Sequence, residues 1–145
     1  MGLTLFKPET KKRCPLPLFA AKVKAGFPSP ADDFVEERLD LNDYLIERPA
    51  ATFFVRVDGD SMTGAGIHPG DILIVDRSLE PLSGRIVIAV IDGAFTVKRI
   101  RIASNEEILL EPENPAFEPI RVGPGSDFQI WGVVTYVIHK AVRSS

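Results

Sequence analysis

Apolar and polar residues alternate in short runs along most of the chain beyond residue 50, and such runs predict β-strands rather than helices. Gly, Pro, Asp and Asn interrupt the runs at intervals of roughly ten residues, which is typical of compact all-β domains. The pattern predicts a mainly β fold with seven strands, at 52–57, 71–76, 85–91, 94–102, 107–112, 119–122 and 128–138.

Two of these strands are separated by only two residues, Asp92 and Gly93. An Asp-Gly pair between apolar runs is typical of a type I′ turn, because both central positions of that turn need a positive φ. The sequence therefore predicts that strands 85–91 and 94–102 form a hairpin.

The N-terminal part of the chain has a different pattern. Residues 1–30 contain five prolines and little periodicity, so we expect an extended arm there and a single β domain over residues 31–145. A short helix is expected at the start of this domain. It would begin at Asp40 or Asn42 and end before Pro49, since the residue before a proline is disfavoured in the α region.

Length and composition agree with one domain. A chain of 145 residues with 45% hydrophobic residues can bury one core. The longest apolar runs fall well short of the roughly 20 residues of a membrane helix, and the N-terminus has no stretch typical of a signal peptide. The lone Cys14 cannot form an internal disulfide. We therefore expect a cytoplasmic protein that does not enter a membrane.

The net charge of −3 is distributed unevenly. Residues 1–25 contain six basic residues and one acidic residue, whereas residues 26–145 contain 11 basic and 19 acidic residues. The arm thus carries about +5 and the body about −8. Because neutralisation of phosphates supplies most non-specific affinity for nucleic acids, we expect no direct, specific DNA binding by this body.

A Ser-Met pair stands inside the stretch VRVDGDSMTGAGIHPGDILIVD, residues 55–76. Ser61 follows a predicted strand and the tight turn DGD, which would present its hydroxyl at a chain reversal. Nearby backbone N–H groups could bind an oxyanion. The alternative is a turn serine that bonds its own backbone.

One lysine lies on an apolar face of a predicted strand. With a period of two, Lys98 shares its face with Thr96, Ile100 and Ile102, while the neighbouring arginines point to the other face. Most strand lysines extend their ammonium groups into water. A lysine held among apolar side chains loses its charge more easily, however, and can act as a base.

Other catalytic arrangements fit poorly. His68 lies in the same loop as Ser61, and His139 lies near the C-terminus, so neither clearly completes a Ser-His-acid triad. The sequence GDSMT ends in Thr63 and does not match the G-x-S-x-G elbow of lipases. It echoes the GDSL esterases but lacks their D-x-x-H block. No metal motif or phosphate loop is present, so we expect no metal and no cofactor. The catalytic pair that remains is Ser61 with Lys98.

The motifs GDSM, GDILIVD and DGAFTVKRI together resemble the LexA-type serine-lysine peptidases, in which a strand lysine about 37 residues after the serine acts as base. The upstream stretch PLFAAKVKAGFPSPADDFVEERLDLNDYLIERPAATFFV is similar to the UmuD-like SOS mutagenesis proteins of this family. The resemblance extends from about Pro15 to Val134, nearly the whole chain.

This resemblance implies a compact, twisted, partly barrel-like β domain of the LexA/signal-peptidase type with an extended N-terminal arm. It implies that Ser61 is the nucleophile and Lys98 the general base. The backbone N–H groups of Ser61 and Met62 would form the oxyanion hole. Self-cleavage would occur between Ala25 and Gly26. UmuD itself has Cys where this chain has Ala25, but LexA-like repressors also use Ala-Gly.

The family also implies partners: a second copy of the chain in a homodimer, the RecA-DNA filament that triggers cleavage, and a UmuC-like catalytic subunit of an error-prone polymerase. The 25 residues before the scissile bond are too few for the DNA-binding domain of a repressor. Three other functions compete with this one: a signal peptidase, which needs a membrane anchor; a non-catalytic polymerase-binding module with a vestigial site; and a small esterase.

Overall fold

The structure is a computed structural model that describes residues 2–8, 15–19 and 35–142. The chain divides into two compact units, one of Met1–Pro8 with Arg48–Ser145 and one of Glu9–Glu47. The expected cleavage site at Ala25 and Gly26 and the single Cys14 lie outside the described residues.

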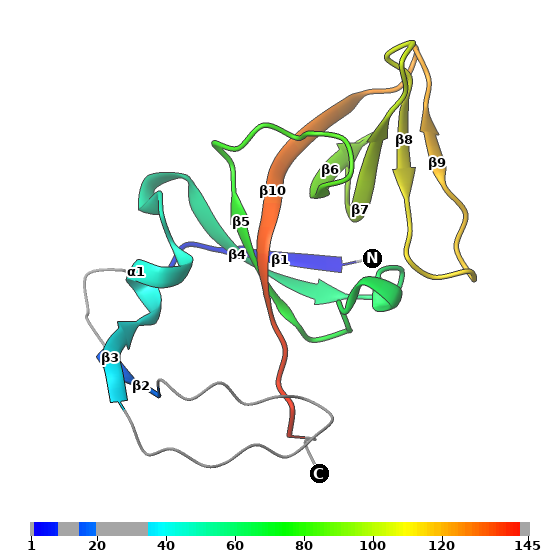
Figure 1. Cartoon of the computed structure of the whole chain (residues 1–145). Helices are drawn as coiled ribbons and strands as arrows, with labels where there is room; N and C mark the ends of the chain where they lie inside the picture. Colours follow the sequence, from blue (N-terminus) through cyan, green and yellow to red (C-terminus); the bar gives the residue numbers. More distant parts are fainter. Residues whose placement is uncertain (1, 9–14, 20–34, 143–145) are drawn as a thin grey trace. The chain divides into compact units, whose positions relative to one another are not determined.

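The larger unit is an antiparallel sheet of eight strands in the order β1-β4-β5-β10-β6-β7-β8-β9. The sheet curls into a half-barrel, which confirms the mainly β, partly barrel-like fold expected from the sequence (Figure 1). Its strands are β1 (Gly2–Phe6), β4 (Thr52–Asp58), β5 (Ile72–Asp76), β6 (Ile86–Ile91), β7 (Ala94–Ile102), β8 (Ile108–Glu111), β9 (Ile120–Val122) and β10 (Phe128–Ile138).

All seven predicted strands are confirmed, and no end differs from its prediction by more than one residue. The predicted hairpin is confirmed as well. Ile91 pairs with Ala94, and the two residues between them have positive φ angles, 46° at Asp92 and 81° at Gly93. A glycine is favoured at the second of these positions because a Cβ atom disfavours the left-handed region.

Strand β1 was not predicted. It pairs antiparallel with β4 along its whole length, from Gly2 opposite Asp58 to Phe6 opposite Phe54. The first 30 residues contain no long alternating run, and a five-residue edge strand leaves little signal in the sequence. Its stability comes from pairing with a strand some 50 residues away, which a local pattern does not contain.

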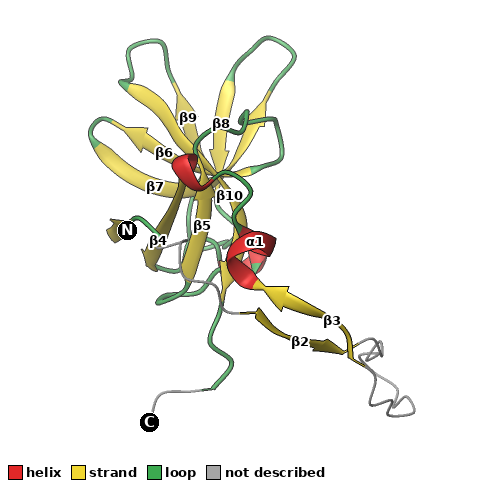
Figure 2. Ribbon diagram, turned by 90° about the vertical axis from the view of Figure 1, so that its left-hand side faces the viewer, coloured by secondary structure: helices red, strands yellow, loops and turns green. Residues whose placement is uncertain are grey.

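The smaller unit contains β2 (Pro15–Phe19) and β3 (Val35–Asp40), which pair antiparallel, and helix α1 (Leu41–Leu45) (Figure 2). Neither strand was predicted. In β2 the two prolines hid the alternation of apolar and polar residues, and β3 begins shortly after the segment that was expected to be an extended arm. Proline is tolerated in this ladder because each strand of a two-stranded sheet has a free edge. The short helix is confirmed: the Asp40 side chain caps it by accepting from the Asn42 N–H at 2.9 Å.

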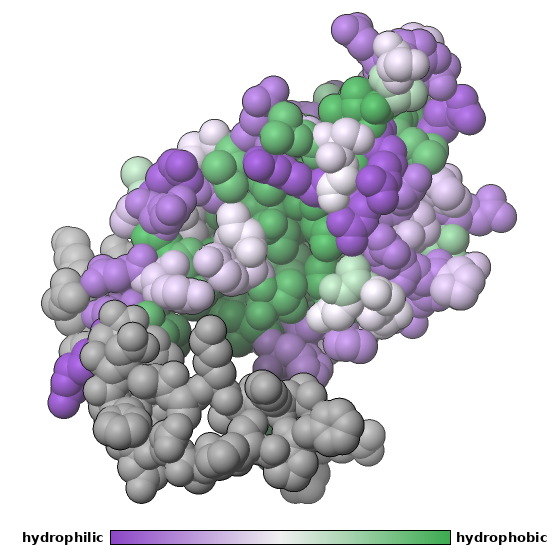
Figure 3. All heavy atoms as spheres, in the orientation of Figure 1, coloured by the Kyte–Doolittle hydropathy of each residue, from purple (hydrophilic) through white to green (hydrophobic). Residues whose placement is uncertain are grey.

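Buried apolar residues of the larger unit form two clusters. The first contains Met62 and Val97, the neighbours in sequence of Ser61 and Lys98, so both chemically interesting residues are held by chain that is anchored in the core. Figure 3 shows that apolar residues also gather in the middle of one face of the molecule, between polar margins. The first cluster consists of Val55, Val57, Met62, Ile67, Leu73, Val75, Ile88 and Val97; the second consists of Val87, Ala89, Ile100, Leu110 and Val133.

Within the residues that the structure describes, no helix is both long enough and apolar enough to span a bilayer.

Candidate active site

The serine predicted as nucleophile lies in the loop that follows β4. Ser61 is 2% exposed, and the next residue, Met62, inserts its side chain into the first core cluster at 1% exposure. A short 3-10 turn, Thr63–Ala65, follows. Because the Met62 side chain is packed in the core, the backbone of Ser61 is held in place by the core.

Lys98 extends from β7 to this serine. Its Nζ lies 3.1 Å from Ser61 Oγ, 2.7 Å from Thr96 Oγ1 and 3.1 Å from the Val97 carbonyl oxygen. The residue is 6% exposed. The alternative of a lysine with its ammonium group in water is therefore wrong for this position. Folding brings together two side chains that are 37 positions apart.

Burial lowers the pKa of Lys98, because removing an ammonium group from water disfavours its charged form. The three contacts suit both protonation states. A charged ammonium donates to all three oxygens. A neutral amine has two protons and one lone pair, so it can donate to Thr96 and Val97 and accept the Ser61 hydroxyl proton. The neutral state is the one in which this lysine can activate a serine as a nucleophile.

A second loop, just after β8, braces the serine loop. The Glu113 N–H donates to the Ser61 carbonyl at 2.8 Å, and the Gly64 N–H donates to the Glu113 carbonyl at 2.7 Å. The Asn114 side-chain amide donates to the Asp60 carbonyl at 2.8 Å. Sequence reasoning missed this brace. The Asn-Pro pair that begins at Asn114 indicates a turn, but nothing local reveals which loop that turn contacts.

The backbone around Ser61 can accommodate an oxyanion. Thr63 N–H points to the Asp60 carbonyl at 3.4 Å, whereas among the described residues no acceptor pairs with the backbone N–H of Ser61 or Met62. These two groups are the donors that the sequence analysis expected. Because the expected cleavage site, Ala25-Gly26, lies outside the described residues, the structure does not place a substrate carbonyl against them.

The two histidines are used elsewhere. His139 Nδ1 lies 2.7 Å from Asp71 Oδ1, the backbone N–H of His68 donates to Asp71 Oδ2 at 2.8 Å, and the two imidazole rings are 5.1 Å apart. Within the described part of the chain, neither ring makes a hydrogen bond to Ser61. This geometry gives Ser61 a lysine rather than a histidine as its partner.

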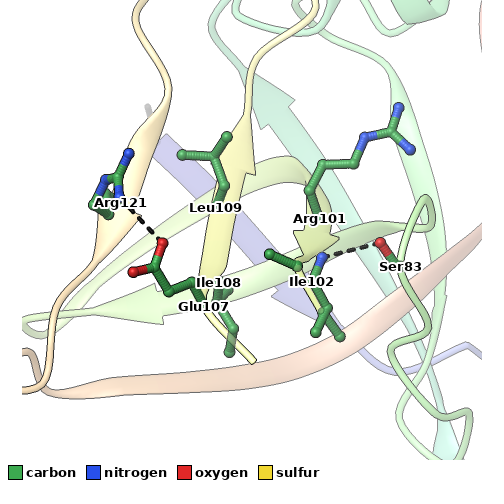
Figure 4. A pocket seen from close by; sticks show the side chains of 8 residues that line it. Ser83, Arg101, Ile102, Glu107, Ile108, Leu109 and Arg121 are labelled. Carbon is green, nitrogen blue, oxygen red and sulfur yellow. Dashed lines mark hydrogen bonds and ion pairs between the residues drawn. The ribbon is translucent and has the colours of Figure 1, made fainter. Parts of the chain in front are cut away.

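Hollows open on the surface of the larger unit, and two of them are lined by described residues. One, of about 510 Å³, lies beside the serine loop, and Gly64, Glu113 and Asn114 are among its lining residues. The other, of about 230 Å³, lies over β7, β8 and β9 (Figure 4). Its two arginines already pair with acids, Arg121 with Glu107 at 3.2 Å and Arg101 with Glu111 at 3.0 Å. The described residues contain no cluster of three His, Cys, Asp or Glu side chains suited to a metal ion.

Comparison with known proteins identifies the family. Residues 17–135 match the peptidase S24-like family. The chain belongs to this family. It is 53% identical to the protein SamA of Salmonella typhimurium over 86% of this chain and 85% of that protein. It is 42% identical to MucA of Escherichia coli, over 83% of this chain and 82% of that protein, and 44% identical to the LexA repressor of Xylella fastidiosa, over 77% and 52%.

These relatives confirm the resemblance seen in the sequence motifs. The chain is a UmuD-like member of the LexA-type serine peptidases, and relatives such as SamA and MucA are SOS mutagenesis proteins. Membership of a serine peptidase family gives the buried contact between Ser61 and Lys98 a chemical meaning that its geometry alone would leave open.

Proposed function

We propose that this protein is a self-cleaving accessory subunit of an error-prone translesion DNA polymerase in the SOS response, and that its Ser61-Lys98 dyad cuts the chain between Ala25 and Gly26. The observation that carries the proposal is the 3.1 Å contact between Lys98 Nζ and Ser61 Oγ at a buried site, in a chain of the S24-like family.

The first chemical step uses the neutral form of Lys98. As Ser61 Oγ attacks the Ala25 carbonyl carbon, Nζ takes the hydroxyl proton, and the carbonyl oxygen becomes an oxyanion that the Ser61 and Met62 N–H groups can stabilise. The protonated lysine then gives its proton to the Gly26 nitrogen as the C–N bond breaks. The products of this step are a free amino terminus at Gly26 and an ester between Ala25 and Ser61.

Water completes the reaction. Lys98, neutral again, removes a proton from a water molecule as the water oxygen attacks the ester carbon. Lys98 then gives that proton to the Ser61 oxygen as this oxygen leaves. The released fragment, residues 1–25, ends in the Ala25 carboxylate. No metal or cofactor is required, because the lysine supplies the base and the backbone supplies the electrostatic stabilisation.

The proposal includes three partners. The RecA-DNA filament would stimulate cleavage, the processed chain would bind a UmuC-like catalytic subunit, and the chain would act as a homodimer. A homodimer is supported by the apolar residues exposed at the end of β10, Tyr136, Val137 and Ile138, which are 40%, 36% and 45% exposed. The RecA-DNA filament and the polymerase subunit act on DNA, so the proposal places the protein in the cytoplasm.

A non-catalytic polymerase-binding module with a vestigial site is the competing function. The burial of Lys98 weighs against it. A buried ammonium group costs folding free energy. Its hydrogen-bond acceptors here are Thr96 Oγ1, the Val97 carbonyl oxygen and the hydroxyl of Ser61, the serine that it would activate. A site without a function would have no reason to retain both the costly lysine and the serine.

Incubation of the purified chain with and without RecA-DNA filaments tests the proposal. Mass spectrometry should detect a fragment ending at Ala25 and a chain beginning at Gly26. Ser61→Ala and Lys98→Ala should each abolish both products while the fold, followed by circular dichroism, stays intact. Cleavage near the wild-type rate in either variant would exclude the dyad, and an uncleaved wild-type chain that still supports mutagenesis would favour the non-catalytic module.

A further inference from the structure

Apart from β1, the strand pairing leaves two sheet edges uncovered beside the dyad. One side of β4 pairs with β5, so its other side needs a different partner. Strand β7 pairs with β6 from Ala94 to Arg99, but β8 covers its opposite side only from Arg99 onward. The outer edge of β4 leads into the Ser61 loop, and the outer edge of the first half of β7 carries Lys98. An extended peptide laid along these edges would pass both catalytic candidates.

Strand β1 occupies this place. It pairs with β4 and also lies alongside β7 (Figures 1 and 2). Gly2 stands opposite Asp58, three residues before Ser61. The Leu3 side chain packs against the core cluster that contains Met62 and Val97. The N-terminal end of the chain thus fills the edge next to the dyad.

The other end of β1 is fastened to the chain that precedes β4. Lys7 Nζ donates to the Pro49 carbonyl at 2.7 Å and to the Ala50 carbonyl at 2.9 Å, and it lies 4.3 Å from the centre of the Phe53 ring. Phe6 meets Phe54 edge to face at 5.5 Å. Lys7 is exposed, so its two hydrogen bonds hold β1 in place without making it a permanent part of the core.

A cleavage segment needs the same edge. Peptides that are bound in extended form add a strand to a sheet edge, where main-chain hydrogen bonds fix the register. The Ala25 carbonyl must reach Ser61 Oγ, and a sheet edge accepts one strand at a time. We infer that the edge of β4 is a binding surface for an extended peptide, and that residues 2–7 are its internal occupant and must leave before the cleavage segment can enter.

This inference rests on the proposed function, since it concerns how the same site is controlled. It gives the uncleaved chain a means of remaining uncleaved that is separate from the protonation of Lys98. A trigger that draws β1 away from β4 would open the site, and a trigger that acts on the lysine alone would not.

Two substitutions weaken β1 at opposite ends. Lys7→Ala removes the two hydrogen bonds to Pro49 and Ala50, and Leu3→Asp places a charge against the core. Lys140→Ala is the matched control, because Lys140 is exposed and removal of its side chain also removes one positive charge. Each is made in the full-length chain, both with Ser61 intact and with Ser61→Ala, which allows binding to be measured without cleavage.

In the Ser61→Ala background, a fluorescent peptide of residues 20–30 reports on access to the edge. We expect Lys7→Ala and Leu3→Asp to bind it several-fold more tightly than the parent, Lys140→Ala to match the parent, and an added peptide of residues 1–8 to compete. Hydrogen exchange at β4 amides should rise in the two β1 variants. Unchanged binding and exchange in both variants, with melting temperatures that show a folded body, would overturn the inference.

The chains with intact Ser61 separate this inference from the proposed function. Faster self-cleavage in the two β1 variants supports both. Tighter peptide binding without any cleavage, in the wild type or the variants, supports the internal occupant and contradicts the proposed peptidase. Cleavage at the same rate in the wild type and in both β1 variants supports the peptidase and overturns the internal occupant.

Discussion

Arg99 and Glu113 form an ion pair, with 2.7 Å between Nε and Oε1. The pair links β7, which carries the proposed base, to the loop that braces the proposed nucleophile. Arg99 follows Lys98 directly, and the Glu113 backbone N–H donates to the Ser61 carbonyl. Arg99 also donates to the Gly84 carbonyl at 2.7 Å. The pair therefore acts on the spacing of the dyad from outside it.

The first prediction is that Glu113→Gln slows self-cleavage by a few-fold, because a partly exposed ion pair contributes about 0.2–1 kcal/mol. The backbone contacts of residue 113 remain, so a total loss is not expected. Glu111→Gln is the matched control, since it breaks the neighbouring pair with Arg101, which does not touch the serine loop. Equal rates for both variants in a timed mass-spectrometric assay would contradict a positioning role for Glu113.

The second prediction concerns Thr96, whose Oγ1 lies 2.7 Å from Lys98 Nζ. Thr96→Val keeps the shape but removes the oxygen. A hydrogen bond to a charged group contributes about 1.5–3 kcal/mol, and about 1.4 kcal/mol changes a rate tenfold. At high pH, where Lys98 is neutral before the step and becomes charged in it, cleavage should therefore slow by roughly ten-fold or more. At lower pH Lys98 is charged in both states, so the slowing should be smaller. Since this oxygen favours the ammonium form, its loss should also move the pH profile toward lower pH. Thr96→Ser should restore both rate and profile, and a rescue that fails would contradict the role.

The third prediction is that spontaneous cleavage accelerates as pH rises from 7 toward 10. Burial lowers the pKa of Lys98 below its ordinary value of 10.5, so the neutral fraction grows through this range and levels off above the lowered pKa. Rates measured in buffers of matched ionic strength, without RecA, would test this. A rate that is flat or falls over the range would argue against a lysine base.

The same pKa shift has a consequence for stability. Between the lowered pKa of folded Lys98 and its unfolded value, the unfolded chain binds more protons than the folded chain, so this residue makes the fold more stable as pH rises through that window. The free energy of unfolding can be measured with denaturant at several pH values for Ser61→Ala and for Ser61→Ala/Lys98→Met. In this pH window it should rise with pH more steeply for Ser61→Ala, and the double variant should lack the contribution of Lys98.

The fourth prediction concerns Gly64, where an added Cβ would lie 2.5 Å from the Glu113 carbonyl oxygen. Because that neighbour is backbone, Gly64→Ala must push the two loops apart and break the hydrogen bond between them. We expect slower cleavage and a loss of about 1–3 kcal/mol in unfolding free energy. Gly125→Ala is the control, since its Cβ would meet open space. A wild-type rate in Gly64→Ala would show that the brace is not needed for cleavage.

The fifth prediction is that residues 26–145 fold alone and support mutagenic synthesis constitutively, whereas full-length Ser61→Ala does not. The body keeps seven of the eight strands of the larger sheet and both core clusters. It loses β1 with the partial packing of Leu3, and it loses β2, the partner of β3, so its melting temperature should be several degrees lower. Thermal unfolding and a mutagenesis assay in cells that lack their own version would test this. Equal activity of both forms would mean that the arm is not a switch.

Local pattern determined much of this protein. Alternation with a period of two placed every strand beyond residue 50, the Asp92-Gly93 pair set the hairpin, and that alternation put Lys98 on one face with Thr96, whose oxygen it contacts. These features follow from backbone geometry and turn chemistry, which act over a few residues. The spacing of Ser61 and Lys98, with their flanking motifs, also sufficed to indicate the family.

Tertiary structure decided the rest. Three features depend on segments that are tens of residues apart in the sequence. They are the burial that lowers the pKa of Lys98, the contact of Glu113 with the Ser61 loop, and the pairing of β1 with β4. A local pattern shows that a segment can be a strand or a turn, but its partner depends on how the sheet curls. Strand β1 is the clearest case: five residues without a distinctive signal are held by an edge of the sheet that exists only once the chain has folded.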